Sequence, residues 1–418
     1  MVQNRKINNS IKLIMKSLLV ILSFVFVFQL NAQNWTPVTT GTTEFLYAVY
    51  FPDTLIGYAV GVNNTIIKTT DGGTTWTPLS SGISADFTDV YFLNKDTGFV
   101  TGANNVLLKT KNGGTTWTSL ATGVTSNLTR ISKYGNIIYV TGYIGTFIKS
   151  SDEGLTWTDL STGTAYTYNT CFFNNSSTGY VVDQVGNIHK TIDGGNTWST
   201  KNGGTTAHLQ SVVFTSANTG YVVGGTYNST YGVIHKTTDA GNTWSKQTIP
   251  YNYFSNIRFL NANVGFIIGG DGNADTCSIY KTMDAGANWV LENCSSYRMY
   301  GGCFPSSHIG FLCGSHGTIL KNSNIDVGIG EVYNNSEINL NVYPNPSHDS
   351  RFTFELNNNS LQINNWVIEI FNIMGEKVYQ SEFLNSKTEI NPDLPCGLYL
   401  FKVNNENKLV TSGKILID

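Results

Sequence analysis

The sequence predicts an all-β protein in which a seven-bladed β-propeller is followed by a small β-sandwich. Three observations carry this prediction. Tryptophan recurs at a near-constant interval, short β-rich runs are separated by Asn, Asp and Gly, and the tryptophan period stops before residues 339–418. No long stretch of the repeats has a period near 3.6 residues, so helices are not expected there. A repeat of 40 to 45 residues with four short strands is typical of a propeller blade.

Six tryptophans mark the repeat, and each follows a short turn that begins with Asp or Asn and contains Gly. The steps between them are 41, 40, 41, 46 and 45 residues. The first turn residue and the tryptophan of each copy are Asp71 and Trp76, Asn112 and Trp117, Asp152 and Trp157, Asp193 and Trp198, Asp239 and Trp244, and Asp284 and Trp289. The polar side chain can accept hydrogen bonds from its own turn, and Gly permits positive φ. We therefore expect a structural role for these residues, with the indole ring wedged between neighbouring blades.

The four strands of the unit are clearest in the second copy, at residues 87–92, 98–102, 106–110 and 117–120. The third strand occurs seven times, but the seventh copy has no tryptophan strand after it. A matching segment at Trp35 precedes the first copy instead. We therefore expect residues 35–38 to supply the outer strand of the seventh blade, which would remove an open sheet edge. The predicted propeller spans residues 34–325.

The two ends of the chain have different patterns. In residues 1–33, Lys12 and Lys16 precede an apolar run, which predicts a secretory signal peptide whose apolar core is too short to span a membrane comfortably. A linker is expected over residues 326–338. Alternating apolar residues in 339–418 predict the strands of the sandwich. The net charge is −3 and 13% of residues are charged, so no basic surface for nucleic acid is expected. We expect a monomer without a transmembrane segment in the mature chain.

Two groups of motifs resemble known families. The tryptophan turns resemble the Asp-box, or BNR, repeat of sialidases and sortilin-type propellers. Their spacing and the Gly-Tyr/Phe-x-Val-Gly second strand are most similar to the photosystem II assembly factor family of seven-bladed propellers. The segments 343–346, 372–375 and 394–399 resemble motifs of the C-terminal sorting domain of type IX secretion. These resemblances imply that the boxes are a folding device on the face away from the ligand. They also imply that the type IX secretion machinery is a partner through residues 339–418.

The same resemblance implies export through the periplasm to the outer cell surface or the extracellular space. Exported proteins can keep disulfides. Blade six places Cys277 at the start of its third strand and Cys294 at the end of its fourth, so we favour a disulfide between them. A second hypothesis pairs Cys303 with Cys313, on neighbouring strands of blade seven. The alternative is that these cysteines are simply buried as thiols.

The sequence gives little support for catalysis. Sialidases resemble one another in an arginine triad, and the predicted propeller contains only Arg130, Arg258 and Arg298. Arg130 aligns with Asp89 and Arg258 with Tyr91, positions that we expect to face opposite sides of the sheet, so these arginines should not converge. No nucleophile-elbow, zinc-protease or phosphate-loop motif occurs. We predict a non-enzyme without a catalytic residue; the alternative is a glycoside hydrolase or a sialidase-like enzyme.

The loops between the second and third strands are the first candidate for ligand binding. They are longer in blades five and six, where Tyr227 and Tyr231 are suited to stack on a sugar or a peptide. Asp271, Asn273 and Asp275 alternate as calcium ligands do, but too few ligands are present for a full calcium loop. No other cofactor or metal is expected. Because loops also vary in length without binding anything, the alternative is a rim without a ligand.

The entrance of the central pore is the second candidate. The repeat position of Asp89 is occupied around the ring by Ala48, Asp89, Arg130, Thr170, Ser211, Asn256 and Gly301. Asp89 and Arg130 are neighbours in this ring and are expected to pair. The sequence thus predicts a secreted or cell-surface binding propeller. Its ligand, an extracellular protein or a glycan, is expected at the loop rim of blades five and six.

Overall fold

The computed structural model describes residues 35–226, 231–250, 252–271, 274–292, 294, 296–325, 340–356, 366–372, 376–383, 385–405 and 408–418. The chain divides into two compact units, Met1–Val327 and Gly328–Asp418. The predicted signal peptide and linker lie outside the described residues. The described residues form strands and one three-residue 3-10 helix, Ser315–Gly317, so the all-β prediction is confirmed.

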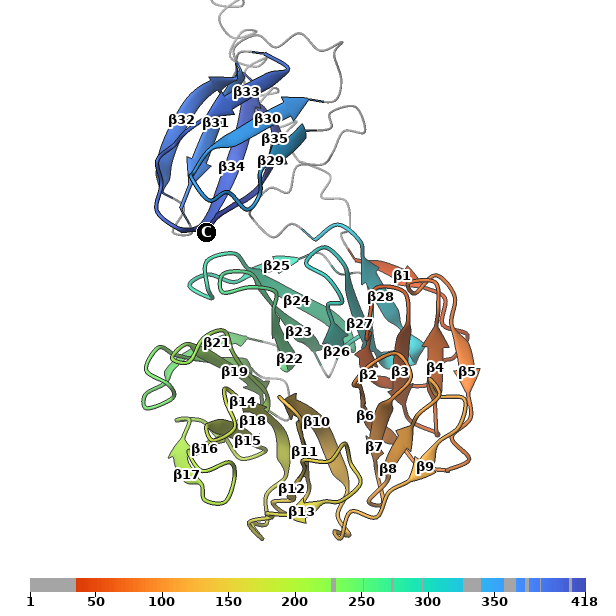
Figure 1. Cartoon of the computed structure of the whole chain (residues 1–418). Coiled ribbons are helices and arrows are strands. Elements are labelled where there is room, and N and C mark those ends of the chain that lie inside the picture. The colour runs from red at the N-terminus through yellow and green to blue at the C-terminus, as the bar shows by residue number, and fades with distance from the viewer. Residues whose placement is uncertain are drawn as a thin grey trace, which may run out of the picture. The chain divides into compact units, whose positions relative to one another are not determined.

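The first unit is a ring of seven four-stranded antiparallel sheets (Figure 1). Blades one to three are β2–β5 (Leu46–Tyr50, Gly57–Gly61, Ile66–Thr69, Thr77–Leu79), β6–β9 (Phe87–Phe92, Gly98–Gly102, Leu107–Thr110, Thr118–Ser119) and β10–β13 (Leu128–Tyr134, Ile137–Gly142, Phe147–Ser150, Thr158–Asp159). Blades four to six are β14–β17 (Tyr168–Phe173, Gly179–Asp183, Asn187–Thr191, Ser199–Asn202), β18–β21 (His208–Phe214, Gly220–Gly225, Tyr231–Thr237, Ser245–Pro250) and β22–β25 (Tyr253–Phe259, Gly265–Asp271, Thr276–Thr282, Val290–Glu292). Each first strand lies innermost and each fourth strand outermost.

The seventh blade joins the two ends of the ring. It contains β26 (Met299–Cys303), β27 (Gly310–Gly314) and β28 (Ile319–Asn322), and its outer strand is β1 (Thr36–Val38) from the start of the propeller. Thr36 pairs with Lys321 and Val38 with Ile319 in an antiparallel register. The predicted closure by residues 35–38 is therefore confirmed.

Hydrophobic clusters between consecutive blades hold the ring together, and each contains one tryptophan of the repeat. Trp35 lies in the cluster between blades six and seven, and Trp76 lies between blades seven and one. Trp117, Trp157, Trp198, Trp244 and Trp289 occupy the remaining five clusters in order. Burial of aromatic rings supplies much of the stability of such interfaces, because apolar area leaves water.

The predicted turns form regular hydrogen-bonded units, as blade five illustrates. The Asp239 carboxylate accepts hydrogen bonds from the Thr243 hydroxyl at 2.6 Å, the Thr243 amide at 2.9 Å and the Thr237 hydroxyl at 2.8 Å. These donors favour the charged form, with the Thr243 hydroxyl contributing most, and they lower the pKa of Asp239 to about 2. Gly241 has a φ of 75°, as the turn requires.

A lysine in the third strand of most blades bonds to the turn of the next blade. Lys68 Nζ donates to the Gly113 carbonyl at 2.8 Å, and Lys321 Nζ donates across the closure to the Gly72 carbonyl at 2.7 Å. The same contact to the next turn is made by Lys109, Lys149, Lys190 and Lys236. The lysines that recur in the third strand therefore link the turns around the ring.

The second unit contains two antiparallel sheets. One is formed by β29 (Leu340–Tyr343), β30 (Phe352–Leu356) and β33 (Lys387–Ile390). The other is formed by β31 (Trp366–Phe371), β32 (Lys377–Phe383), β34 (Gly397–Asn405) and β35 (Lys408–Ile417). Buried side chains of both sheets share one hydrophobic cluster, as in a two-layer β fold. Asn345 accepts from the Leu416 amide at 2.9 Å and donates to the Lys414 carbonyl at 2.8 Å, which ties the Pro-Asn-Pro segment to the last strand.

Candidate functional site

The central channel of the ring opens through a mouth that every blade helps to form. The innermost strand of each blade contains a register shift at one residue. The residues at these shifts are Tyr47, Thr88, Thr129, Asn169, Gln210, Ser255 and Tyr300. All of them line one cavity of about 470 Å³. The bulges therefore direct one side chain from each blade into the mouth.

This mouth lies on the face that carries the loops between strands two and three and between strands four and one. Its lining includes Ala103 and Tyr143 from the first kind of loop and Asp86 and Asn127 from the second. The tryptophan turns lie at the opposite ends of the strands. There the Gly113 amide, for example, donates to the carbonyl of Asp96 in the turn between the first two strands, at 2.9 Å.

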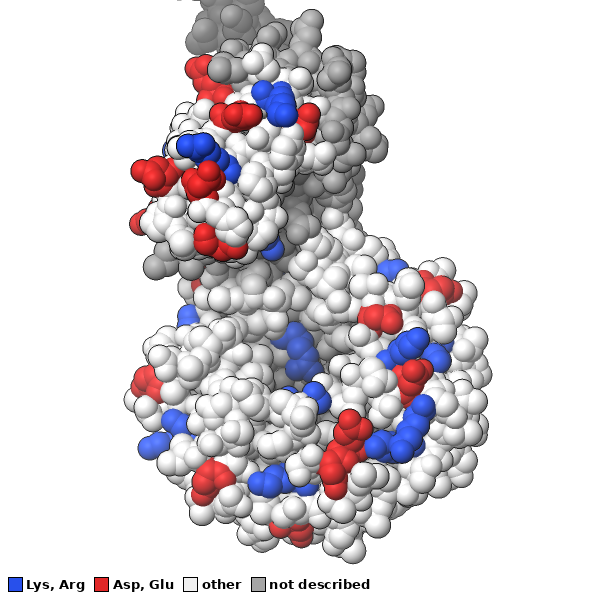
Figure 2. All heavy atoms as spheres, viewed as in Figure 1, with Lys and Arg blue, Asp and Glu red and all other residues white. Residues whose placement is uncertain are grey.

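The rest of the channel, called here its deeper part, is a second cavity of about 570 Å³ that extends to the turn between β26 and β27 at the opposite face of the ring. Its lining contains the complete predicted ring of residues at the repeat position of Asp89. Arg130 and Gln210 line both cavities, so the mouth and the deeper part meet at these residues. Figure 2 shows basic side chains inside the hollow at the centre of the propeller.

Asp89 and Arg130 form an ion pair in this channel. Arg130 Nη1 lies 3.3 Å from Asp89 Oδ1, and the Ile131 amide donates to Asp89 Oδ2 at 2.8 Å. Removal from bulk water raises the pKa of the Asp89 carboxyl, although Arg130 opposes that shift.

The expectation that Arg130 and Arg258 do not converge is wrong. Both line the deeper cavity, and the charge of Arg130 helps to lower the pKa of Arg258 after the larger effect of desolvation. The reason is the period of a strand: the aligned positions of Asp89 and Tyr91 are two residues apart and so share a face. Arg258 stays accessible to water inside the channel, although protein surrounds it.

The third arginine of the described propeller residues, Arg298, lies at the mouth. Its guanidinium carbon is 4.6 Å from the centre of the Tyr253 ring and 5.5 Å from that of Tyr300. Its Nε atom is buried without a hydrogen-bond partner among the described residues. Two aromatic rings thus hold the guanidinium in one place through cation–π contacts, where it lines the cavity.

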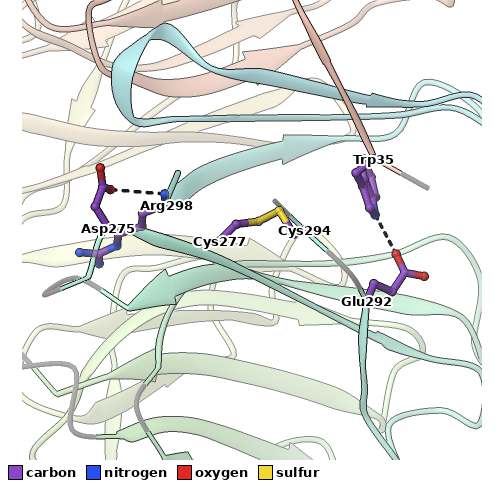
Figure 3. The surroundings of a disulfide bond; sticks show 6 residues. All are labelled: Trp35, Asp275, Cys277, Glu292, Cys294 and Arg298. Carbon is purple, nitrogen blue, oxygen red and sulfur yellow. Dashed lines mark hydrogen bonds between the residues drawn. A yellow bond between two sulfur atoms is a disulfide. The ribbon is translucent and has the colours of Figure 1, made fainter. Parts of the chain in front are cut away.

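Asp275, a predicted rim residue, fixes the segment that carries Arg298. Asp275 Oδ1 accepts from the Arg298 backbone amide at 3.3 Å and from the Ser315 hydroxyl at 2.9 Å, and Oδ2 lies 3.3 Å from His316 Nδ1. Figure 3 shows the Asp275–Arg298 bond beside the disulfide between Cys277 and Cys294, whose Cα atoms are 5.8 Å apart. The favoured disulfide is therefore present, and it lies close to Asp275 and Arg298.

The other predicted rim residues are spread more widely. Tyr227 and Asn273 lie outside the described residues. Tyr231 packs against the hydrophobic cluster between blades four and five, and Asp271 ends β23 opposite Thr276. The calcium hypothesis stays a prediction; the Asp275 oxygens already have protein partners.

The second disulfide hypothesis is wrong, because Cys303 and Cys313 are free thiols. In the antiparallel register Cys303 lies opposite Phe311 and Cys313 opposite Gly301, so the two cysteines are diagonal neighbours. Diagonal positions are about 7–8 Å apart, beyond the usual Cα separation of a disulfide.

An aromatic cluster at the mouth was missed by the sequence analysis. Tyr300 contacts Tyr47 at 5.5 Å and Phe45 at 6.3 Å between ring centres, and His316 contacts Phe45 at 5.7 Å and Tyr297 at 4.3 Å. Phe45 and Tyr297 are exposed. The available signal was the bulge position, which is aromatic only in the first and last copies. These copies become neighbours because the ring closes.

Comparisons with known proteins match both units. Residues 75–166 match the family described as photosynthesis system II assembly factor YCF48, and residues 341–418 match the secretion system C-terminal sorting domain. None of the curated proteins matches the chain. A solved structure described as YCF48 bound to D1 peptide is 21% identical, with a TM-score of 0.59, and the match covers 71% of this chain and 97% of that one.

Two further solved structures support the same fold. YCF48 from Cyanidioschyzon merolae is 18% identical, with a TM-score of 0.57 and coverage of 69% of this chain and 98% of that one. The WD40 propeller domain of Doa1 is 9% identical, with a TM-score of 0.57 and coverage of 68% and 94%. Among the described residues, no helix has the length and apolar character needed to cross a membrane. The chain thus contains a seven-bladed propeller that is similar to the YCF48-like, BNR type, followed by a segment that matches a secretion system C-terminal sorting domain.

Proposed function

We propose that this protein is an exported, non-catalytic binding propeller that holds an extracellular protein or glycan on its loop face. The ligand would contact the rim of blades five and six and the adjoining channel mouth. The observation that carries this proposal is the Arg298 guanidinium, held between Tyr253 and Tyr300 at a mouth to which all seven blades contribute. Aromatic rings with one fixed charged group are typical of binding surfaces.

Three further features support this proposal. Blades five and six have second and third strands of six or seven residues, longer than in most other blades, which raise this side of the rim. Exposed Phe45 and Tyr297 extend the aromatic surface toward blade one. The YCF48 structure described with a bound peptide shows that a propeller of this architecture can hold a polypeptide.

A carbohydrate-active enzyme is the second candidate. Glycosidases use two carboxyl groups at a defined separation on either side of the bond they cleave. In the channel, the oxygens of Asp89 are bonded to Arg130 and to the Ile131 amide. This use of the carboxylate favours structural pairing over acid–base chemistry.

The test combines a glycan array with a pull-down from the outer surface of the native cell. We expect one ligand to bind the wild-type mature protein and to bind at least about tenfold more weakly to Arg298→Gln and Tyr300→Ala, since each removes a central contact. Tyr134→Ala is the matched control, because Tyr134 is exposed at the other end of the strands. Equal binding by all variants would place the ligand elsewhere. Hydrolysis of a polysaccharide that is lost in Asp89→Asn would overturn the non-enzyme proposal.

A further inference from the structure

We propose that the deep part of the central channel is a binding site for a carboxylate, formed by Arg130 and Arg258. The site adjoins the mouth, with which it shares Arg130, but the proposal does not depend on the proposed function. Its natural source would be an acidic residue, a peptide terminus or a uronic sugar, because these share the carboxylate group.

The charge of the channel differs from that of the whole protein. The chain carries a net charge of −3, yet the deep cavity is lined by Arg130, Lys133 and Arg258 and by one carboxylate, Asp89. Low-dielectric walls focus the field of such charges along a channel. An anion that enters is therefore attracted, although the surface as a whole is weakly acidic.

Unlike Arg130, Arg258 has no carboxylate within ion-pair distance among the described residues. Its Nη1 atom donates to the Ile257 carbonyl at 3.4 Å, and Asp89 bonds instead to Arg130 and to the Ile131 amide. Two guanidinium groups in one cavity repel each other, and Asp89 compensates only one of them. A bound monoanion would compensate the other, since guanidinium groups pair well with planar carboxylates.

The surroundings of the arginines are suited to a small polar group. Asn256, two residues before Arg258 on the same strand face, also lines the cavity, and its side-chain NH₂ group is a possible hydrogen-bond donor to a carboxylate. Thr170 and Ser211 complete a polar arc in the same cavity. A cavity of about 570 Å³ has room for a carboxylate and the group that carries it.

The experiment uses the full mature protein at constant ionic strength. The probes are N-acetylglycine, which represents a peptide terminus, and glucuronate, which represents a uronic sugar. Their neutral counterparts are N-acetylglycinamide and glucose, and sulfate and phosphate are separate arms. Binding is measured by calorimetry and by the shift in melting temperature. We expect at least one carboxylate to bind and both neutral counterparts not to bind.

Two variants should change this affinity in opposite directions. Arg258→Gln should weaken carboxylate binding at least about tenfold, because it removes a charged hydrogen-bond donor. Asp89→Asn should strengthen it, because it removes the competing anion while keeping the side-chain shape. Lys111→Gln, a loss of one exposed cation in the turn after β8, is the matched control and should leave binding unchanged.

Three results would overturn the proposal. The first is equal binding of the carboxylates and their neutral counterparts. The second is unchanged affinity in Arg258→Gln. The third is unchanged or weaker affinity in Asp89→Asn, which decides the matter even if Arg258→Gln does not fold. Tighter binding of phosphate than of either carboxylate would also contradict the proposed class of ligand.

Discussion

His235 is a residue whose departure from the repeat lowers the stability of the protein in mild acid. It lies in the third strand of blade five, where blades two, three and six have Leu108, Ile148 and Tyr280. Blade four has His189 there, whose ring nitrogens contact Thr200 and Asp183. The His235 side chain is fully buried, and neither ring nitrogen has a hydrogen-bond partner among the described residues. Burial, followed by the charge of Lys246, lowers the pKa of His235 to about 4. The native protein therefore holds this imidazole neutral.

The consequence is a loss of stability in mild acid. Between pH 6.5 and 4 the unfolded chain binds a proton at His235 that the native state does not, so the free energy of unfolding falls as pH falls. At pH 5 the loss is on the order of 2 kcal/mol relative to pH 7. Urea unfolding at pH 5, 6 and 7 should show this dependence in the wild type and much less of it in His235→Leu, the residue that blade two uses. His348→Gln, which removes an exposed histidine, is the control and should keep the wild-type pH dependence. An equal pH dependence in the wild type and in His235→Leu would contradict the prediction.

At the scale of the element, closure of the ring depends on the short strand β1 and on the indole ring of Trp35. Trp35 is fully buried, packs edge-on against Phe266 and Phe304, and donates to Glu292 Oε2 at 2.7 Å (Figure 3). The indole nitrogens of the six tryptophans in the predicted turns have no hydrogen-bond partner among the described residues. Trp35 therefore has a contact that the other tryptophans lack.

Deletion of residues 34–40 should sharply lower the melting temperature, because it removes the outer strand of blade seven and exposes the edge of β28. Trp35→Phe should keep most of the packing but leave the Glu292 carboxylate without its donor, at a cost of about 1–3 kcal/mol. Thermal and urea unfolding of both variants measure these effects, with Trp35→Phe compared against Trp76→Phe, which loses no such bond. A melting temperature unchanged by the deletion would show that closure by β1 does not stabilise the ring.

At the scale of the whole molecule, the repeats in the sequence explain which features of the structure could be predicted from it. Residues that recur in phase, such as Trp117 and its turn, predicted the blades, their strands and the closure. The site depends on residues that differ between copies at one repeated position, and their arrangement requires the ring itself. Tyr47 and Tyr300 become neighbours only through closure, and the convergence of Arg130 with Arg258 was missed through a wrong assignment of strand faces. The disulfide partner Cys294 was found because its hairpin is local.

The separation into two compact units gives the last prediction. The final strand β35 contributes Ile415 and Ile417 to the core of the second unit, and its backbone bonds to Asn345. Truncation after residue 407 should therefore unfold the sorting unit and abolish export. The propeller should keep its melting temperature, because its hydrophobic clusters contain only propeller residues. Cell fractionation and unfolding of the purified protein measure the two effects separately. Surface display of the truncated chain would show that recognition by the secretion machinery does not require this core, and a lowered propeller melting temperature would show that the two units stabilise each other.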